Sequence, residues 1–377
     1  MPYTARMRRA VGAVRATLEN AGISAPPECL REHGEHEPDA DAPLVLVACS
    51  GGRDSMALAA VAHIVCAALR VRCGAIIIDH TLQAGSQTVA QQAAQRCQQL
   101  DLDPVIVRRI TVTDDGRGAE AAARDARYAA ICETAREINA AAVLLAHTLD
   151  DQAETVLIGL LRSEGVDALA GMPETFERDG VRFLRPLIDL TRADTTGICE
   201  DLHLEWWDDP TNGDDKLSPA LLNAPQELTA VYPLRSRIRH MLLPFLTDFA
   251  GGNIAAHLAH GSKLLRRDKD YLDAQADAAL QRAWLDPADD ILRLSASVLA
   301  HEHPAIRLRV LAHALAGAGI NASARHIEAI DQLITHWHGQ GAVNLPSGYS
   351  VNRRKHVIRL CQDGEHANRR RSGPDRS

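Results

Sequence analysis

The sequence predicts an α/β protein in which a parallel twisted sheet, with helices on both faces, is followed by a smaller, mainly helical domain. Short apolar segments alternate with longer helical segments over residues 44–188, and this alternation is typical of parallel strands joined by crossover helices. Residues 254–338 are strongly helical. With 377 residues, of which 46% are hydrophobic, the chain is long enough for two or three domains with buried cores.

The chain before the sheet divides into a helix and a linker. Residues 4–21 carry apolar side chains at helical spacing, which predicts one amphipathic helix. Residues 31–43 are acidic and contain proline, so we expect a mobile linker. No segment has 18 uninterrupted apolar residues, and the N-terminal segment lacks the apolar core of a signal peptide. We therefore expect a cytoplasmic protein with no membrane span.

Alternating strands and helices make up the sheet region. A strand that returns to the same sheet through a helix does so by a right-handed crossover, and ligands of such sheets bind at the carboxyl ends of the strands. We expect strands at 44–49, 74–79, 104–108 and 142–147, with a weaker candidate at 183–188, and helices at 55–70, 86–100 and 118–139.

The first strand ends at a glycine turn. Residues 44–55 read LVLVACSGGRDS, and a helical segment follows. This order presents backbone N–H groups and a helix N-terminus to a phosphate. Gly51 and Gly52 lack Cβ, so the main chain can approach a phosphate closely, while the hydroxyl groups of Ser50 and Ser55 add donors. For the turn alone, a plain connection between strand and helix remains an alternative.

Asp54 is unexpected in an anion-binding loop. A carboxylate repels a phosphate unless a metal ion or a cationic substrate lies between them, so Asp54 indicates chemistry as well as binding. The segment fits neither the Walker motif nor GxGxxG. It resembles the SGGxDS loop of the N-type ATP pyrophosphatases, which cleave ATP to AMP and pyrophosphate. That resemblance implies ATP contacts along residues 50–55, Arg53 included.

Polar residues also follow two other strands. Asp79 and His80 come at the end of the second, and His147 at the end of the fourth. Asp151 and Glu154 lie on one face of the helix that begins there, because three residues separate them. Acids at a helix start can simply complement the helix dipole, and a histidine at a strand end is as often a packing residue as a ligand. Near an ATP site, the two carboxylates suit magnesium or a substrate ammonium group.

The net charge of −8 conceals a division along the chain. Residues 231–377 contain 20 Lys and Arg against 14 Asp and Glu, whereas residues 1–230 contain 21 against 35. Such asymmetry indicates a region that binds a polyanion, although solvated arginine-rich helices are the ordinary alternative.

Six further segments resemble the motifs of the tRNA(Ile)-lysidine synthetases, in the same order along residues 44–245. AHTLDDQAET is similar to the family's AHHxDDQAET, although Thr148 stands where the family has a second histidine. The other segments are GAEAAARDARY (118–128), DHTLQAGS (79–86), LLRSEGVDALAGMP (160–173), RPL (185–187) and SRIRHMLLP (236–244).

The resemblance implies a reaction in two steps. ATP would adenylate O2 of the wobble cytidine of tRNA(Ile), whose anticodon is CAU, and release pyrophosphate. The ε-amine of L-lysine would then displace AMP and give lysidine. ATP and Mg²⁺ are the implied cofactors, and tRNA(Ile) and L-lysine the implied partners, while a homodimer is left open.

The same resemblance implies residue roles. Asp54 would lie near magnesium or the lysine amine, and the two α-helical carboxylates would hold lysine, with Arg124 or Arg127 as the catalytic arginine. The implied ATP contacts are Ser50, Gly51, Gly52, Arg53, Asp54, Ser55, Asp79, His80 and His147, the implied lysine contacts are Asp151, Glu154 and Arg124, and the implied tRNA contacts are Arg235, Arg237, Arg239, Arg353, Arg354 and Lys355.

We expect four regions. Residues 1–43 are the helix and linker, 44–245 a Rossmann-like ATP pyrophosphatase (PP-loop) domain, 246–361 a helical and mixed tRNA-contacting domain, and 362–377 a disordered basic tail. Within the domain at 246–361, residues 342–360 read as short strands around a Pro-Ser-Gly turn, with the basic residues 353–355 at a hairpin.

Three alternatives remain from the sequence. A tRNA 2-thiolating relative would share the loop, but normally has paired cysteines, and the eight cysteines here form no C-x-x-C. A relative that makes a small molecule would not need the basic C-terminal part. A non-catalytic ATP-binding α/β module would not need the acids.

Overall fold

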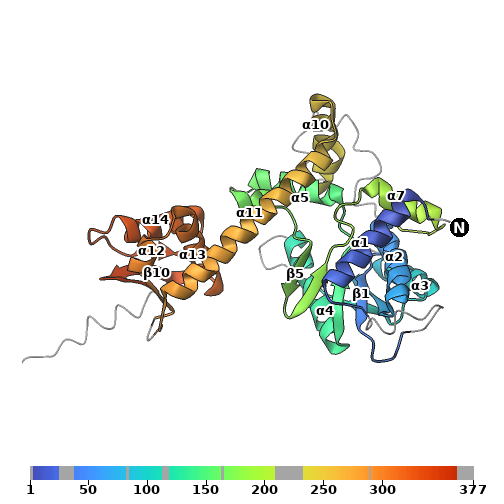
Figure 1. Ribbon diagram of the computed structural model, residues 1–377, viewed down its shortest axis with the longest axis horizontal. Helices are drawn as coiled ribbons and strands as arrows, with labels where there is room; N and C mark the ends of the chain where they lie inside the picture. Colours follow the sequence, from blue (N-terminus) through green and yellow to red (C-terminus); the bar gives the residue numbers. More distant parts are fainter. Residues whose placement is uncertain are drawn as a thin grey trace, which may run out of the picture. The chain divides into compact units, whose positions relative to one another are not determined.

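The computed structural model describes residues 3–24, 38–81, 85–112, 119–162, 165–208, 232–287 and 290–362 (Figure 1). Residues 363–377 of the expected basic tail and most of the expected linker lie outside these residues, as do residues 209–231. The chain divides into two compact units, Met1–Arg266 and Arg267–Ser377. Among the described residues, no helix has the length and apolar character needed to cross a membrane.

A six-stranded sheet forms the centre of the first unit. Its strand order is β3-β2-β1-β4-β6-β5, and every neighbouring pair is parallel except β5 and β6. This confirms the predicted parallel sheet. The strands are β1 (Leu44–Ala48), β2 (Arg72–Asp79), β3 (Val105–Arg109), β4 (Ala140–Leu144), β5 (Thr175–Arg178) and β6 (Val181–Leu184).

Helices cover both faces of this sheet. On one face α1, α2, α3 and α7 pack over Val45 and Val47, and on the other α4 packs over Leu46, because alternate residues of a strand point to opposite faces. The predicted helices are confirmed. The helices are α1 (Ala5–Asn20), α2 (Arg53–Leu69), α3 (Ser86–Gln99), α4 (Ala119–Glu137), α5 (Leu149–Arg162), α6 (Val166–Leu169) and α7 (Arg192–Asp201).

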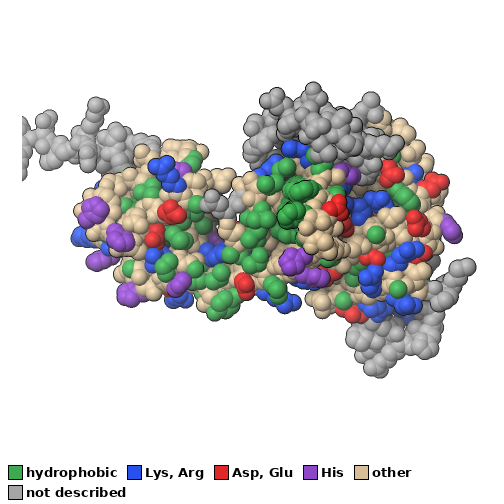
Figure 2. All heavy atoms as spheres, turned by 90° about the horizontal axis from the view of Figure 1, so that it is seen from above, with side chains coloured by type: hydrophobic (Ala, Val, Ile, Leu, Met, Phe, Trp, Pro, Cys, Tyr) green, Lys and Arg blue, Asp and Glu red, His purple; other side chains and the backbone are tan. Residues whose placement is uncertain are grey.

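A further helical segment packs against α5. It comprises α9 (Leu234–Arg237), one π-helical turn (Ile238–Leu242) and α10 (Leu243–Ala250), and leads into α11 (Ile254–Ala283). Ile238 and Leu243 meet Ala153 and Leu157 of α5 in a small core. This core fixes the position of the arginines on α9 and the π-helical turn. On the face seen in Figure 2, hydrophobic side chains gather where α10 lies, and Phe245 and Phe249 of α10 are exposed.

The second unit combines helices with a five-stranded antiparallel sheet, ordered β7-β8-β11-β10-β9. The predicted hairpin is confirmed, since β10 and β11 flank residues 355–356. The sequence did not indicate β7 and β8. The elements are β7 (Trp284–Leu285), β8 (Leu292–Ser295), α12 (Ala296–Ala300), α13 (Pro304–Gly317), α14 (Ala324–Thr335), β9 (Val343–Leu345), a 3-10 turn (Pro346–Gly348), β10 (Tyr349–Arg354) and β11 (Val357–Gln362).

Candidate active site

The candidate site lies where the strand order reverses direction along the sheet. The crossover after β1 leads to β2 on one side, whereas β4 pairs with β1 on the other side. In doubly wound sheets this point leaves a crevice at the carboxyl ends of the strands. The loop after β1 carries the Ser-Gly-Gly turn, and the loop after β4 leads into the acidic start of α5.

The turn after β1 has the geometry of a phosphate-binding loop. Gly51 has φ of +79°, and a Cβ added there would lie 2.9 Å from Cβ of Ala93 on α3, so glycine is required. Gly52 is the N-cap of α2 and supplies no side-chain acceptor to the first N–H groups of the helix. The hydroxyl group of Ser55 donates to the carbonyl oxygen of Gly52 at 2.8 Å and accepts from the N–H of Ser50 at 3.2 Å.

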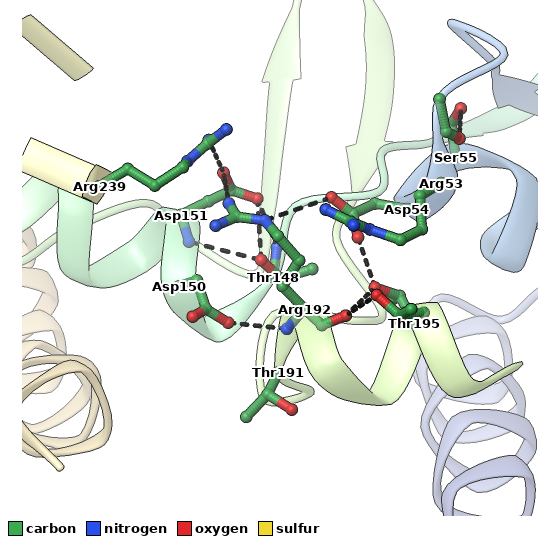
Figure 3. Close-up of polar contacts among 12 residues, drawn as sticks. Arg53, Asp54, Ser55, Thr148, Asp150, Asp151, Thr191, Arg192, Thr195 and Arg239 are labelled. Atoms are coloured by element: carbon green, nitrogen blue, oxygen red, sulfur yellow. Dashed lines mark hydrogen bonds and ion pairs between the residues drawn. The ribbon is translucent and has the colours of Figure 1, made fainter. Parts of the chain in front are cut away.

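Two charged residues, Arg53 and Asp54, come directly after the glycine loop and begin α2. Nε of Arg53 is buried and has no hydrogen-bond partner among the described residues. Asp54 accepts a hydrogen bond from the hydroxyl group of Thr195, and its Oδ2 lies 3.8 Å from Nε of Arg192 (Figure 3). Burial raises the pKa of Asp54, while the Thr195 hydrogen bond and the Arg192 charge oppose this shift.

The start of α5 places two carboxylates beside Asp54. Asp151 accepts hydrogen bonds from the N–H and the hydroxyl group of Thr148 at 2.9 and 3.0 Å, so Thr148 and Asp151 also stabilise the helix start. Glu154, one turn later, is fully buried. Asp150 accepts a hydrogen bond from the backbone N–H of Arg192 at 2.7 Å. The acids therefore do more than complement the helix dipole.

Three guanidinium groups surround these carboxylates. Nη2 of Arg192 lies 3.2 Å from Asp151 and 3.3 Å from Glu154. Arg239 binds both oxygens of Glu154, at 2.7 and 3.1 Å, and Nε of Arg235 lies 3.7 Å from the same carboxylate. We call these six residues the acid–arginine cluster: Asp54, Asp151, Glu154, Arg192, Arg235 and Arg239.

The cations of the cluster favour the charged form of one buried carboxylate, that of Asp151. Burial alone would raise the pKa of Asp151, but the charges of Arg192 and Arg235 and the hydrogen bond from the N–H of Thr148 outweigh it and lower that pKa. The same carboxylates raise the pKa of Arg192. A carboxylate as buried as Glu154 requires such cations, because an unpaired charge in a protein interior is costly.

The expected crevice histidines lie at the ends of their strands. His147 accepts a hydrogen bond at Nδ1 from Nε of Arg185 at 3.2 Å. Burial and the Arg185 charge lower the pKa of His147 to about 3, so the ring is neutral at pH 7. Nδ1 of His80 is buried without a partner among the described residues, and burial and the Arg127 charge lower its pKa. Asp79 is buried and accepts from the N–H of Thr81 at 3.0 Å.

The arginines expected to be catalytic lie on α4 beside an aromatic ring. The guanidinium carbons of Arg124 and Arg127 lie 5.1 and 5.7 Å from the ring centre of Tyr128. Burial lowers the pKa of Arg127. The structure thus places both arginines at Tyr128, next to the sheet. The side chain of Arg192, by contrast, lies between Asp54 of α2 and the carboxylates of α5.

The residues expected to contact tRNA divide into anchored and exposed groups. Arg235 and Arg239 belong to the acid–arginine cluster, and Nε of Arg237 is buried without a partner among the described residues. In the second unit, Arg353 donates to backbone carbonyl oxygens of Leu333 and Ile334 at 2.8 and 3.0 Å, which fixes its position against α14. Arg354 and Lys355 are exposed.

The sequence interpretation missed Arg192. One signal could have found it: Thr191 and Asp194 form a capping box, which makes Arg192 the first residue of α7. A cation is unfavourable at a helix N-terminus unless acids lie nearby. Arg192 therefore indicated an acidic environment, although the sequence alone did not show which acids supply it.

Comparison with known proteins finds relatives along nearly the whole chain. A family model described as the PP-loop domain matches residues 29–224, and a model described as the TilS substrate binding domain matches residues 294–360. A tRNA(Ile)-lysidine synthase of Bifidobacterium longum subsp. infantis is 58% identical over 98% of this chain and 100% of its own length. That of Bifidobacterium animalis subsp. lactis is 50% identical over 98% of this chain and 99% of its own length.

A more distant relative gives the same result. The tRNA(Ile)-lysidine synthase of Streptomyces coelicolor is 44% identical over 83% of this chain and 84% of its own length. The glycine turn, the acidic start of α5 and Arg192 all lie inside the PP-loop match. The resemblance found in the sequence motifs is confirmed, and the chain belongs to the tRNA(Ile)-lysidine synthase family.

Proposed function

We propose that this enzyme converts the wobble cytidine of tRNA(Ile) with the CAU anticodon to lysidine, through an adenylated tRNA intermediate. The observation that carries the proposal is the arrangement of Asp151 and Glu154 beside the Ser-Gly-Gly turn at the ends of β1 and β4. A phosphate-binding loop and a buried acidic pair in one crevice suit a reaction between ATP and a cationic amine. Family membership supports the same assignment.

ATP binding is assigned to the loop after β1. The N–H groups at the start of α2 and the hydroxyl groups of Ser50 and Ser55 would bind phosphate oxygens. Arg53, whose buried Nε has no partner among the described residues, would add a cationic donor. Asp79, His80 and His147 border the same strand ends and are proposed to contact the nucleotide.

A magnesium ion fits one part of this site. Among the described residues, no group of three or more His, Cys, Asp or Glu side chains could hold a metal ion. Magnesium at nucleotide sites usually takes one or two carboxylates together with substrate phosphates, and Asp54 beside the phosphate loop fits that mode. Bound there, the ion would neutralise phosphate charge. Asp54 would then be the protein ligand.

Lysine binding is assigned to Asp151 and Glu154. Their charges face three guanidinium groups, so the substrate ammonium would exchange with one of these cations. Arg124, on α4, is proposed to bind the lysine carboxylate, with Arg127 as the alternative. In the second step the ε-amine attacks C2 of the adenylated cytidine, the C–O bond to AMP breaks, and a proton leaves the amine.

Binding of the tRNA is assigned to basic residues in each of the two units. Arg237 is the arginine of α9 whose Nε is free of hydrogen bonds among the described residues, and Arg354 and Lys355 are exposed on the hairpin. Phosphate groups bind such cations without sequence preference. The domain boundaries at 44–245 and 246–361, the basic tail and a cytoplasmic location remain part of the proposal, and the oligomeric state is left open.

The test is a reaction mixture of the full chain with ATP, Mg²⁺, L-lysine and total tRNA. We expect AMP and a lysine-labelled tRNA only when both co-substrates are present, and pyrophosphate release that requires tRNA but not lysine. If AMP forms without lysine but with a sulfur donor, the enzyme is a thiolating relative. If no ATP is consumed under any condition, the chain is an ATP-binding module.

A further inference from the structure

Arg192 occupies the first position of α7 and is held there from two sides. Its backbone N–H donates to Asp150 of α5 at 2.7 Å, and the capping box of Thr191 and Asp194 fixes the helix start around it. A cation at a helix N-terminus meets the positive end of the helix dipole. Its position is therefore stable only because carboxylates from neighbouring elements compensate that charge.

The side chain of Arg192 reaches carboxylates on two different elements. Its Nη2 contacts Asp151 and Glu154 on α5, at 3.2 and 3.3 Å, while its Nε faces Asp54 on α2 at 3.8 Å (Figure 3). The side chain is 17% exposed, so solvent screens these contacts only in part. A guanidinium group is planar with donors in fixed directions, which suits one residue that holds two separate acids.

A second contact joins the same helix to the nucleotide loop. The hydroxyl oxygen of Thr195, one turn after Arg192, lies within hydrogen-bond distance of both Asp54 and the carbonyl oxygen of Arg192, the latter at 2.9 Å, and its one proton serves either acceptor. Sγ of Cys199 lies 3.4 Å from the carbonyl oxygen of Arg53. These contacts connect the start of α7 to the start of α2, and the Arg192 side chain extends the connection to α5.

We propose that Arg192 is a positioning residue that joins the ATP loop to the acidic pair on α5. This inference rests on the proposed function for the identity of the two ligands. The amine and the adenylated carbon react only when they are held within contact distance, so both half-sites must keep one fixed separation. Arg192 fixes that separation by holding Asp54 through one nitrogen and the α5 carboxylates through another.

The first experiment tests the link without using activity. We would measure urea unfolding of Arg192→Gln, Asp54→Asn, Glu154→Gln and the double variants that combine Arg192→Gln with each acid. Each double variant has an expected folding equilibrium constant, calculated by multiplying the changes that the two single substitutions cause. If Arg192 holds both acids, the measured constant differs from this expected value by about fivefold or more.

The control cycle combines Arg192→Gln with Asp201→Asn. Asp201 ends the same helix and pairs with Arg6 at 2.6 Å, away from the cluster, so these two effects should multiply within about twofold. Multiplicative effects in the Asp54 or the Glu154 cycle would overturn the proposal. Should Arg192→Gln fold poorly, Arg192→Lys gives the same cycles, because one ammonium group cannot keep both contacts.

The second experiment tests the positioning role. We expect Arg192→Gln to slow pyrophosphate release and also lysine transfer to purified adenylated tRNA, each by about tenfold or more, which corresponds to losing a charge-assisted hydrogen bond. Dissociation constants for ATP and tRNA should stay within about twofold. Arg192→Lys should recover part of the rate, and Asp201→Asn should keep the wild-type rates.

The outcomes separate the two proposals. Slowing of one half-reaction alone, or wild-type rates for both, would overturn the positioning role. If Arg192→Gln lost tRNA binding and rate to the same extent, Arg192 would have only a structural role, and the positioning role would be overturned as well. A wild-type enzyme without lysine-dependent AMP formation would contradict the proposed function, and the unfolding cycles would still decide whether Arg192 links the two elements.

Discussion

Glu154, which is proposed to bind substrate, also has a structural role in the fold. Its side chain is fully buried, and Arg239 holds both of its oxygens. The sequence placed Glu154 in a lysine site and Arg239 on the tRNA, whereas the structure pairs the two side chains with each other. If Glu154 binds lysine as proposed, the substrate ammonium must replace an arginine contact there.

Glu154→Gln should impair lysine transfer more than adenylation. The substitution keeps the size of the side chain and removes one negative charge, which costs about 1.5–3 kcal/mol, or roughly ten- to a hundredfold in lysine affinity or rate. Labelled ATP should show pyrophosphate release and adenylated tRNA that persists, and a high lysine concentration should restore part of the product. Glu177→Gln, on the exposed surface of β5, is the matched control. Loss of pyrophosphate release with normal lysine affinity would assign Glu154 to the ATP site.

His147 gives the protein a pH-dependent stability. The ordinary pKa of histidine is about 6.5, and the folded protein lowers that of His147 to about 3. The unfolded chain therefore binds a proton at this histidine more readily than the folded protein does. The stability that the neutral His147 ring contributes is complete above about pH 6.5 and decreases as the pH falls from there toward 3. In His147→Gln the free energy of unfolding, measured by urea titration, should fall less between pH 7 and 4. An unchanged pH dependence would contradict the buried, neutral ring.

At the scale of elements, the segment of α9 and the π-helical turn brings cations to α5. Ile238 packs in the small core with Ala153 and Leu157, while Arg235 and Arg239 on either side of it face Glu154. A π-helical turn changes the angular spacing of side chains, and such turns are frequent at functional sites. The turn thus contributes Arg239 to the acid–arginine cluster and is not only a connection.

Arg237→Gln should reduce the salt dependence of tRNA binding. Each phosphate contact releases about one counterion, so the slope of log K against log salt should decrease by about one unit. Arg353→Gln is the contrast, because that side chain is already bound to the end of α14, and its slope should change little. Filter binding at several salt concentrations gives both slopes. An unchanged slope for Arg237→Gln would assign the phosphate contacts elsewhere.

At the scale of the whole molecule, each compact unit has its own hydrophobic core. Leu58 lies in the core of the first unit and Leu311 in that of the second. Separate cores allow separate unfolding, because each unit can lose its own core independently.

Leu311→Ala should therefore destabilise the second unit alone. Loss of a buried leucine costs about 2–5 kcal/mol. Calorimetry should show that one thermal transition moves to lower temperature while the other stays. Leu58→Ala should produce the reverse pattern. A single transition that moves in both variants would show that the two units unfold together.

The sequence predicted the sheet because its signals are local. Apolar runs of five or six residues and the glycine turn are visible without tertiary contacts, and β1, β2, β3 and β4 all form near their predicted positions. The strands that it missed, β5, β7 and β8, have two to four residues each. Strands so short are stabilised by their neighbours in the sheet, which no local pattern reveals.

The site was predictable as far as its residues lie at strand ends. The loop after β1 and the start of α5 follow from the rule that parallel strands bind ligands at their carboxyl ends. The partners of the carboxylates could not be predicted, because Arg192 and Arg239 are 38 and 85 residues away from Glu154 in sequence. The fold brings these charges together, because it places the first residue of α7 and the π-helical turn next to the start of α5.

The close approach of Gly51 to Ala93 has a consequence for motion. Gly51 has no Cβ, and a Cβ built there would lie only 2.9 Å from Cβ of Ala93, so the backbone of the loop after β1 lies directly against α3. A shift of the loop toward α3 by more than the space of one missing methyl group would therefore move α3 as well. A nucleotide that orders the loop should therefore also reduce the opening of α3, which lies behind the loop and contributes no proposed ligand. Hydrogen–deuterium exchange would detect this as slower exchange of amide protons in α3 when ATP is added. If exchange slows in the loop and stays unchanged in α3, the two segments move independently.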